Sequence, residues 1–433
     1  MAMTALDIYK LLPKTNCKKC GFPTCLAFAM SLAQGRVPFE KCPDIAEEGK
    51  TVLSETTTPP MKTIHCGFKD RPFEIGGEEV LFRHEKTFHH YPLFAVTLSD
   101  TLPVKQFAAK VKEIRDMEFK RVGQVLKIDL LAVKNDSRDP DTFVQCIQLT
   151  AGLPLVLISE DLGSIKKAHD FLHEQIPILI GKCTKDWIQT AMEIGAVLAV
   201  QGDSLNEIAQ KSQLALSLGL ETLILSPEVK TLKAALTLFS HLRMTALERA
   251  SRSLSFPLLG LAGHDLALAG NMICKYAGVI IFDTADYQKL LPLITLRLNI
   301  YTDPRHPQIM EPKLYEVGQP DEHSPIIVTT NFSLTFHTVQ SEIENSKIST
   351  YLLITDSEGM SVQTAYAADK FTAVSITNAI RNSGMEEKVR HRKVIIPGYA
   401  AILKAPLEEE SGWEVIVGPK ESNGIPKFLR KLS

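Results

Sequence analysis

The chain lacks the features that mark membrane proteins, secreted proteins and nucleic-acid-binding proteins. No apolar run reaches the roughly 18 residues of a membrane span, and the N-terminus MAMTALDIYK has no apolar core of the kind found in signal peptides. The 48 basic and 50 acidic side chains give a net charge of −2, which offers no counterpart for a polyanion. We therefore expect a cytoplasmic protein with no nucleic-acid partner and no membrane partner.

Cysteine is scarce, with eight in 433 residues, and half of these cysteines are isolated from one another. The isolated ones stand among apolar or loop residues, at Cys66, Cys146, Cys183 and Cys274. In a reducing compartment this distribution is typical of ordinary buried thiols, so we expect no disulfides.

The other four cysteines have the spacing C-x2-C-x4-C-x16-C, at Cys17, Cys20, Cys25 and Cys42. Thiolates suit iron, and three close cysteines with a distant fourth let a short segment wrap a [4Fe–4S] cubane. A structural zinc site is the alternative, but such sites usually have two C-x2-C pairs and the second pair is missing here. Gly21 and Pro23 permit the tight loop, and a helical pattern follows. We expect a small iron–sulfur domain.

The segment from Thr51 to about Pro92 shows no sustained hydrophobic period and contains Gly76-Gly77. We interpret it as a long linker. Its sequence RHEKTFHH holds three histidines, His84, His89 and His90. A surface turn is favoured over a metal site because no carboxylate or cysteine stands at a ligand-like offset.

From Leu93 onward, short apolar runs recur between helical stretches. These runs lack clean alternation, which indicates parallel strands covered on both faces, and eight of them predict a (β/α)₈ barrel. An open doubly wound sheet is the alternative. The predicted strands are residues 93–99, 126–133, 154–159, 177–181, 196–200, 222–226, 257–262 and 278–283.

Polar turns follow these strands, as expected at the active-site end of a barrel. No catalytic constellation stands out. His264-Asp265 is a conceivable acid–base pair, but we expect Asp265 to cap a helix.

A second α/β pattern follows the proline-rich break near Pro304 and Pro307. It predicts strands at 326–330, 350–355, 393–398 and 413–418, and a helix near 373–381. Hydroxyls, glycines and free backbone N–H groups at the carboxyl edge of such a sheet can hold a nucleotide-like ligand.

Taken together, these residues resemble a known family, the large subunit of the corrinoid iron–sulfur protein of the reductive acetyl-CoA (Wood–Ljungdahl) pathway. This subunit is also called the gamma subunit of the acetyl-CoA decarbonylase/synthase complex. The resemblance runs nearly end to end, and the most specific segments are NCKKCGFPTCLAFAM, VLFRHEKTFHH, LRLNIYTDPRHPQIMEPKLYEVG, VTTNFSLT, TDSEGMS and GWEVIVGP.

The resemblance implies an α/β protein with an N-terminal [4Fe–4S] domain (1–57), a linker (58–92), a central TIM-like barrel (93–312) and a C-terminal Rossmann-like domain (313–433). The last domain would bind a cobamide, a cobalamin-type corrinoid, with its lower base detached from cobalt. Three loops matched to the family would hold it, and the implied residues are Thr329, Thr330, Asn331, Ser333, Thr335, Ser357, Glu358, Gly359, Met360, Ser361, Gly398, Gly418 and Glu421. Ser361 is the candidate nearest cobalt. No catalytic residue is assigned.

The implied activity is that of a methyl carrier. Co(I) would accept a methyl group from methyl-tetrahydrofolate through a separate methyltransferase, and methyl-Co(III) would deliver it to acetyl-CoA synthase. The cluster would return oxidised Co(II) to Co(I). The small subunit would complete a heterodimer, and a reductive activator is a further partner. The string Asp321-Glu322-His323 lacks the glycine of the histidine-ligand motif D-x-H-x-x-G, so His323 is expected to be a loop residue.

Two other functions remain open. The chain could be an electron-transfer protein whose cluster reduces a partner's corrinoid, or a barrel methyltransferase that binds folate itself. One departure from the family is Lys18-Lys19, where members usually have a small and an acidic residue. Two uncompensated positive charges should raise the potential of the cluster.

Overall fold

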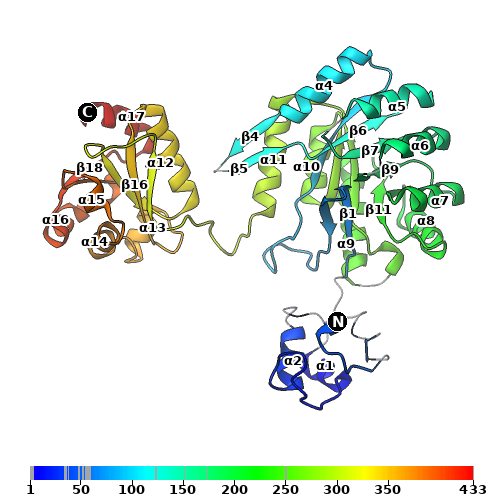
Figure 1. Cartoon of the computed structure of the whole chain (residues 1–433), viewed down its shortest axis with the longest axis horizontal. Helices are drawn as coiled ribbons and strands as arrows, with labels where there is room; N and C mark the ends of the chain where they lie inside the picture. Colours follow the sequence, from blue (N-terminus) through cyan, green and yellow to red (C-terminus); the bar gives the residue numbers. More distant parts are fainter. Residues whose placement is uncertain are drawn as a thin grey trace. The chain divides into compact units, whose positions relative to one another are not determined.

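The computed structural model describes residues 4–33, 37, 39–46, 49–50, 53, 60–121, 124–150, 152–172, 174–248 and 251–432. The chain forms two compact units, one containing Met1–Phe119 and Leu126–Thr302, the other Lys120–Val125 and Asp303–Ser433 (Figure 1). No helix in these described ranges is both long and apolar enough to cross a lipid bilayer.

The first unit begins with a small helical domain. Helix α1 (Ala5–Leu11) packs on α2 (Cys25–Ala33), and the short helix η1 (Phe39–Lys41) follows. Thr4 caps α1 by accepting a hydrogen bond from the backbone N–H of Asp7. The helices enclose a small core of their own, which includes Ile8, Phe28 and Leu32. This core positions the cysteine-bearing loops.

A closed barrel of eight parallel strands makes up the rest of this unit, in the order β10-β11-β12-β13-β3-β6-β7-β9. This closure confirms the predicted barrel and excludes the open sheet. Its strands are β3 (Leu93–Ser99), β6 (Leu130–Lys134), β7 (Leu155–Ile158), β9 (Ile178–Ile180), β10 (Val197–Gly202), β11 (Leu223–Pro227), β12 (Leu258–Gly263) and β13 (Ala277–Phe282). Their side chains are almost all buried, because the helices cover the outer face of the barrel and the inward-pointing side chains of the strands fill its interior.

Eight helices surround the barrel (Figure 1). Asp265 caps α10, since its carboxylate accepts a hydrogen bond of 2.9 Å from the backbone N–H of Leu268. The capping role expected for Asp265 is thus confirmed. The helices are α4 (Val104–Asp116), α5 (Pro140–Gln148), α6 (Leu162–Ala168), α7 (Lys185–Ile194), α8 (Leu205–Ser217), α9 (Leu232–Leu247), α10 (Leu266–Cys274) and α11 (Tyr287–Tyr301).

The described part of the expected linker is not a linker. Strands β1 (Thr63–Phe68) and β2 (Arg71–Gly76) pair as an antiparallel hairpin, and β1 also pairs with β8 (Gln175–Ile176). The weak hydrophobic period of this hairpin explains why its sequence looked unstructured. A second hairpin that the sequence did not reveal joins β4 (Glu118–Arg121) to β5 (Gln124–Lys127).

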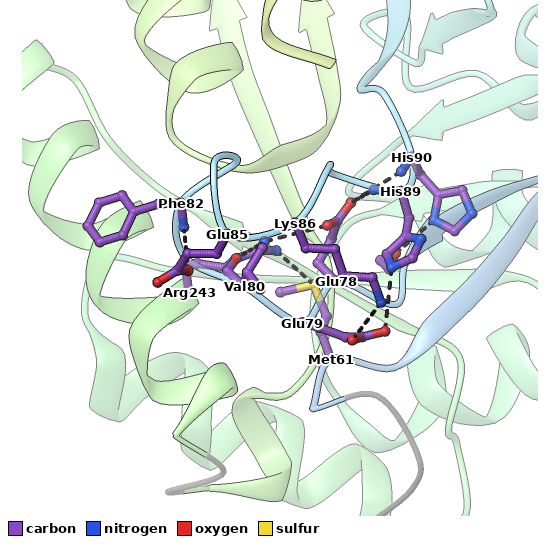
Figure 2. Close-up of polar contacts among 11 residues, drawn as sticks. Met61, Glu78, Glu79, Val80, Phe82, Glu85, Lys86, His89, His90 and Arg243 are labelled. Atoms are coloured by element: carbon purple, nitrogen blue, oxygen red, sulfur yellow. Dashed lines mark hydrogen bonds and ion pairs between the residues drawn. The ribbon is translucent and has the colours of Figure 1, made fainter. Parts of the chain in front are cut away.

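The histidine-rich segment after the hairpin is anchored by a buried ion pair (Figure 2). The Glu78 carboxylate accepts hydrogen bonds from the backbone N–H groups of His89 (2.8 Å) and His90 (3.2 Å). Arg243 of α9 lies 3.6 Å from Glu78 and donates to the Val80 carbonyl at 2.6 Å. The segment is therefore tied to the barrel.

The fold also brings carboxylates to two of these histidines, although no carboxylate stands at a ligand-like offset in the sequence. His89 lies 3.5 Å from Glu79, and His90 lies 3.3 Å from Glu74. Among the described residues, no three His, Cys, Asp or Glu side chains of this segment are arranged to hold a metal ion.

The second unit contains a five-stranded sheet in the order β14-β16-β15-β17-β18. Its four predicted parallel strands are β15 (Ile326–Thr330), β16 (Thr350–Thr355), β17 (Lys393–Ile396) and β18 (Glu414–Val417), and the sequence missed the short antiparallel edge strand β14 (Leu314–Val317). The helices are α12 (Ser333–Ser346), α13 (Val362–Ala367), α14 (Ala373–Asn382), α15 (Met385–Lys388), α16 (Lys404–Ser411) and α17 (Ile425–Leu432).

Candidate functional site

The four N-terminal cysteines lie in two loops and at the start of one helix. Gly21 has a φ of +82° and its N–H donates to the Lys18 carbonyl at 2.9 Å, which makes a tight turn around Cys20. The Asn16 side chain then accepts a hydrogen bond of 2.8 Å from the N–H of Cys25, where α2 begins. Cys25 is buried and Cys17 is exposed.

The electrostatics of Cys42 indicate that the other three cysteines lie in the same small domain, within electrostatic range of Cys42. Burial is the first cause of the raised pKa of Cys42, and the charges of Cys20, Cys17 and Cys25 raise it further. A thiol that senses three other thiolates is stabilised when a cationic metal cluster binds them all. Among the described residues, these cysteines included, no three His, Cys, Asp or Glu side chains are arranged to hold a metal ion. The assignment of the four cysteines to an iron–sulfur cluster therefore depends on their spacing and residue type.

Asp44, which the sequence reading did not single out, lies against this site. Its carboxylate accepts hydrogen bonds from the Lys19 ammonium at 2.9 and 3.1 Å, and lies 3.6 Å from the Cys17 sulfur. The hydrogen bond with Lys19 lowers the pKa of Asp44, and the same contact raises the pKa of Lys19. Lys19 is thus compensated, contrary to the assumption that both lysine charges act on the cluster.

In the second unit, Asn331 ties together two of the predicted ligand loops. Its side-chain oxygen accepts from the N–H of Ser357 (3.0 Å), the hydroxyl of Ser357 (2.7 Å) and the N–H of Gly359 (3.0 Å). Its amide nitrogen donates to Asp356 at 3.0 Å. Asn331 is 1% exposed. The side chains of Asn331 and Ser357 are already bonded to each other. Their role is therefore to fix the positions of the two loops at the carboxyl edge of the sheet.

Other predicted residues also have protein partners. Glu358 pairs with Lys370 at 2.6 Å, and the Ser361 hydroxyl lies 3.1 Å from that of Thr364. Glu421 accepts a short hydrogen bond from the Tyr399 hydroxyl. Gly359 lies beneath Pro307 and Ile309, where a Cβ atom would come within 2.6 Å of both side chains.

An apolar cavity of about 120 Å³ opens at the same edge of this sheet. Thr329, Thr335 and Gly418 are the predicted residues that line it. The hydroxyls of Thr329 and Thr330 are buried and have no hydrogen-bond partner among the described residues. A buried hydroxyl without a partner is costly, so the Thr329 hydroxyl, which lines the cavity, suits a ligand that brings an acceptor or donor.

Most of the cavity wall is apolar and was missed by the sequence reading. No motif could have revealed it, because apolar residues on strands and helices look the same whether they fill a core or line a cavity. The missed apolar residues are Ile327, Val328, Val339, Val362, Ile395, Ile396, Ile425 and Phe428.

Gly398 and Gly418 bring two loops into contact at the cavity rim. A Cβ atom on Gly398 would lie 2.7 Å from the Lys420 nitrogen and 2.8 Å from the Gly418 oxygen. Such a contact leaves no room for a side chain. The two remaining predicted residues lie near these loops. Ser333 is buried and Met360 is partly buried.

His323 lies three residues before β15 begins, in a turn at the amino end of that strand. The predicted ligand loops follow the carboxyl ends of the strands, so His323 lies at the opposite edge of the sheet. The structure thus agrees with the expected loop position.

A four-cysteine motif in a small helical domain, a (β/α)₈ barrel and a parallel sheet with a cavity at its carboxyl edge are the features that define the class of this protein. Two family models match the chain. The first, CO dehydrogenase/acetyl-CoA synthase delta subunit, covers residues 63–429, and the second, an Fe–S cluster family, covers residues 12–43.

The chain is 38% identical to the corrinoid/iron–sulfur protein large subunit of Moorella thermoacetica, over 99% of both chains. It is 33% identical to the acetyl-CoA decarbonylase/synthase complex subunit gamma of Methanothermobacter thermautotrophicus, over 100% of both. The chain therefore belongs to the family of corrinoid/iron–sulfur protein large subunits.

Solved structures of dihydropteroate synthase are also similar to part of the chain. The enzyme of Vibrio fischeri ES114 is 10% identical with a TM-score of 0.41, and the match covers 56% of this chain and 100% of that one. A likeness this low in identity and TM-score has no bearing on function.

Proposed function

We propose that the chain is the large subunit of a corrinoid methyl carrier of the acetyl-CoA pathway. In this proposal Cys17, Cys20, Cys25 and Cys42 hold a [4Fe–4S] cluster, and the C-terminal unit holds a base-off cobamide. The observation that carries the proposal is the apolar cavity at the carboxyl edge of the C-terminal sheet, with the unpartnered hydroxyl of Thr329 on its wall.

The cavity suits the detached lower base of a cobamide, which is a flat aromatic group. Val339, Ile395 and Phe428 supply apolar walls, and Thr329 supplies a hydroxyl that can bond a ring nitrogen. Burying the base here would keep it away from cobalt.

The outer surface of the same edge suits the corrin ring. Leu334, Tyr399 and Ile402 follow the carboxyl ends of β15 and β17, and they are 52%, 41% and 68% exposed. Large apolar side chains exposed together usually mark a ligand or partner surface. The edge therefore offers a platform for a broad, largely apolar macrocycle.

The side chains at this edge also explain how a low-valent metal could be tolerated. Cobalt would supply the nucleophile that accepts a methyl group and the centre that releases it. Ser361 and Thr364 offer only hydroxyls, which are weak donors, and His323 is at the other edge.

The proposed partners follow from the family. We propose a heterodimer with the small subunit, a methyl-tetrahydrofolate:corrinoid methyltransferase as donor, acetyl-CoA synthase as acceptor, and a reductive activator. The cluster domain would restore oxidised cobalt to its reactive state. The names of the similar proteins, a large subunit and a subunit of a decarbonylase/synthase complex, support the first and third of these partners.

The electron-transfer alternative predicts that the chain binds no corrinoid of its own. The test is to purify the chain without oxygen after co-expression with its small subunit and a supply of cobamide, and to measure cobalt, iron and the optical spectrum. We expect about one cobalt and four irons with a base-off spectrum. Iron without cobalt would favour the electron-transfer function, and zinc without iron would overturn the cluster assignment.

A matched pair of cysteine variants sharpens this test. Cys42→Ser should lose most of the iron and keep the cobalt, because the two sites lie in different compact units. Cys66→Ser is the control, because Cys66 is equally buried but lies in β1, in the barrel core.

A further inference from the structure

The mouth of the barrel is a second candidate site, in a part of the chain that the carrier function does not use. A pocket of about 770 Å³ lies at the carboxyl ends of the strands, where barrel enzymes bind their ligands. It is lined by residues from all parts of the strand circle, including Thr97 of β3, Gln201 of β10 and Asp283 after β13.

Apolar and polar sides alternate around the wall of this pocket. The strand order places β7 opposite β12, and β9 opposite β13. Ile158 and Ile180 therefore face Leu261 and Ile281 across the pocket. Two apolar walls that face each other favour a flat ligand lying between them.

The other two sides of the pocket are polar. By the same order β3 lies opposite β10, and β6 opposite β11. Thr97 and Asn135 thus face Gln201 and the β11 side. Asn135 is 8% exposed and donates to the Ser159 hydroxyl at 2.9 Å, so its orientation is held before any ligand arrives.

A buried and unpartnered hydroxyl lies on the inner side of the barrel, beside the residues that line this pocket. Ser226 is 0% exposed, and its hydroxyl has no hydrogen-bond partner among the described residues. It is in parallel register with Gln201, which lines the pocket, so both side chains point to the barrel interior. An unpaired buried hydroxyl is unfavourable by itself and suits a ligand or water that bonds it.

The charged rim adds the last constraint. Its acidic members are Asp136, Glu160, Asp161, Glu228 and Asp283, and its basic members are Lys134, Arg138 and Lys182. Asp136 is already paired with Lys134 at 2.8 Å. A carboxylate in the pocket can accept hydrogen bonds from two adjacent N–H groups of a ligand. A side-chain amide can donate to a ligand carbonyl beside those N–H groups.

We propose that the barrel mouth binds a flat nitrogen heterocycle with a 2-amino-4-oxopyrimidine edge, as found in pterins and in guanine. Asp283 accepts from the adjacent N–H groups of this edge, Asn135 on the same side of the pocket bonds the carbonyl next to them, and Gln201 bonds the opposite edge of the ring. The ring lies between the two isoleucine- and leucine-lined walls. The proposal does not depend on the carrier function, because the barrel alone forms this pocket.

The test is calorimetric titration of the purified full chain with pterin-6-carboxylate, guanosine and adenosine. We expect saturable binding of the first or second probe and none of adenosine, which lacks the edge. Tighter binding of pterin-6-carboxylate than of guanosine assigns a pterin, and the reverse order assigns a guanine compound. Absence of saturable binding of both, or equal binding of adenosine, overturns the proposal.

Variants separate the site from general damage. Asp283→Asn should weaken binding at least about tenfold, the effect of losing a charged hydrogen bond. Ser226→Ala should weaken it about threefold without lowering the melting temperature, since the hydroxyl is unpaired in the free protein. Glu193→Gln on the outer helix α7 is the charge-matched control and should leave affinity unchanged. Wild-type affinity in Asp283→Asn contradicts the assignment.

The same samples are assayed for iron and cobalt. Absence of heterocycle binding at normal metal content would contradict the proposed barrel site alone. Absence of cobalt with normal heterocycle binding would contradict the carrier function alone.

Discussion

Lys19 and Asp44 form an ion pair at the edge of the four-cysteine site, with 2.9 Å between the ammonium nitrogen and the nearer carboxylate oxygen. Asp44 stands two residues after Cys42, and Lys19 stands between Cys17 and Cys20. The pair therefore brings opposite charges from both ends of the motif to one place. Of the two adjacent lysines, only Lys19 is neutralised in this way by a described residue.

This pair predicts how charge sets the potential of the cluster. Asp44→Asn should raise the midpoint potential by roughly tens of millivolts, because it leaves Lys19 uncompensated near a site that gains an electron. Lys18→Gly with Lys19→Glu should lower it. Redox titration followed by electron paramagnetic resonance measures both. Asp7→Asn, which breaks the exposed Lys10–Asp7 pair of α1, is the control. Equal potentials in all variants would contradict this electrostatic account.

A second prediction concerns Asn331, which joins the loops after β15 and β16. Asn331→Ala leaves the buried N–H groups of Ser357 and Gly359 without their acceptor, at a cost of about 2–4 kcal/mol. Urea denaturation should show this loss, and cobalt content should fall because the loops no longer hold their shape. Asn345→Ala on the exposed end of α12 should change neither. Full cobalt content in Asn331→Ala would show that the loops do not depend on this side chain.

A third prediction concerns the contact of two loops at the cavity rim. Gly398→Ala would force its Cβ atom against the Lys420 nitrogen and the Gly418 oxygen, at 2.7 and 2.8 Å. The loops must then separate, and we expect less bound cobamide with an unchanged iron content. Gly270→Ala makes the same chemical change where the nearest atom is 3.7 Å away. It should keep both metals, and a similar cobalt loss in both variants would refute the role of the rim.

A fourth prediction concerns the buried pair of Glu78 and Arg243 (Figure 2). Their side chains are 8% and 2% exposed. Glu78→Ala should destabilise the barrel by about 3–5 kcal/mol, because it leaves a buried guanidinium without its counter-charge. Glu78→Gln should cost less, since the amide oxygen can still accept from the backbone N–H groups of His89 and His90. Thermal unfolding followed by circular dichroism measures both effects.

The control for this pair is an ion pair on the surface. Asp141→Asn breaks the exposed contact with Lys167 and should change stability by less than about 1 kcal/mol. If Glu78→Ala were equally mild, the buried pair would not anchor the histidine-rich segment.

Strong local patterns were enough to predict the main elements. Each apolar run from Leu93 to Asp283 overlaps a barrel strand, because a strand covered on both faces needs apolar residues at successive positions. The run predicted as one strand at 126–133 also includes the end of β5, which lies outside the barrel. The hairpin of β1 and β2 escaped notice because its outer face is polar and exposed, as His65 and Glu74 show. Asp265 was correctly expected to cap a helix because that role depends on residues three positions apart.

Long-range pairing was beyond the reach of the sequence. Asn331 was correctly placed in a loop at the carboxyl edge, but only the fold shows that Ser357 and Gly359 use its oxygen. Asp44 lies 25 residues from Lys19, so their contact depends on how the two loops return to each other.

The sequence by itself determined the cysteine motif, the order of strands and helices, and the family, because each is written in the spacing of residues along the chain. Only the tertiary structure decided which polar side chains form hydrogen bonds within the protein and where the apolar cavity opens. It also decided how apolar and polar walls alternate around the barrel mouth. The physical reason is that a cavity or a compensated charge arises from groups far apart in the chain, and no local pattern records their distance in space.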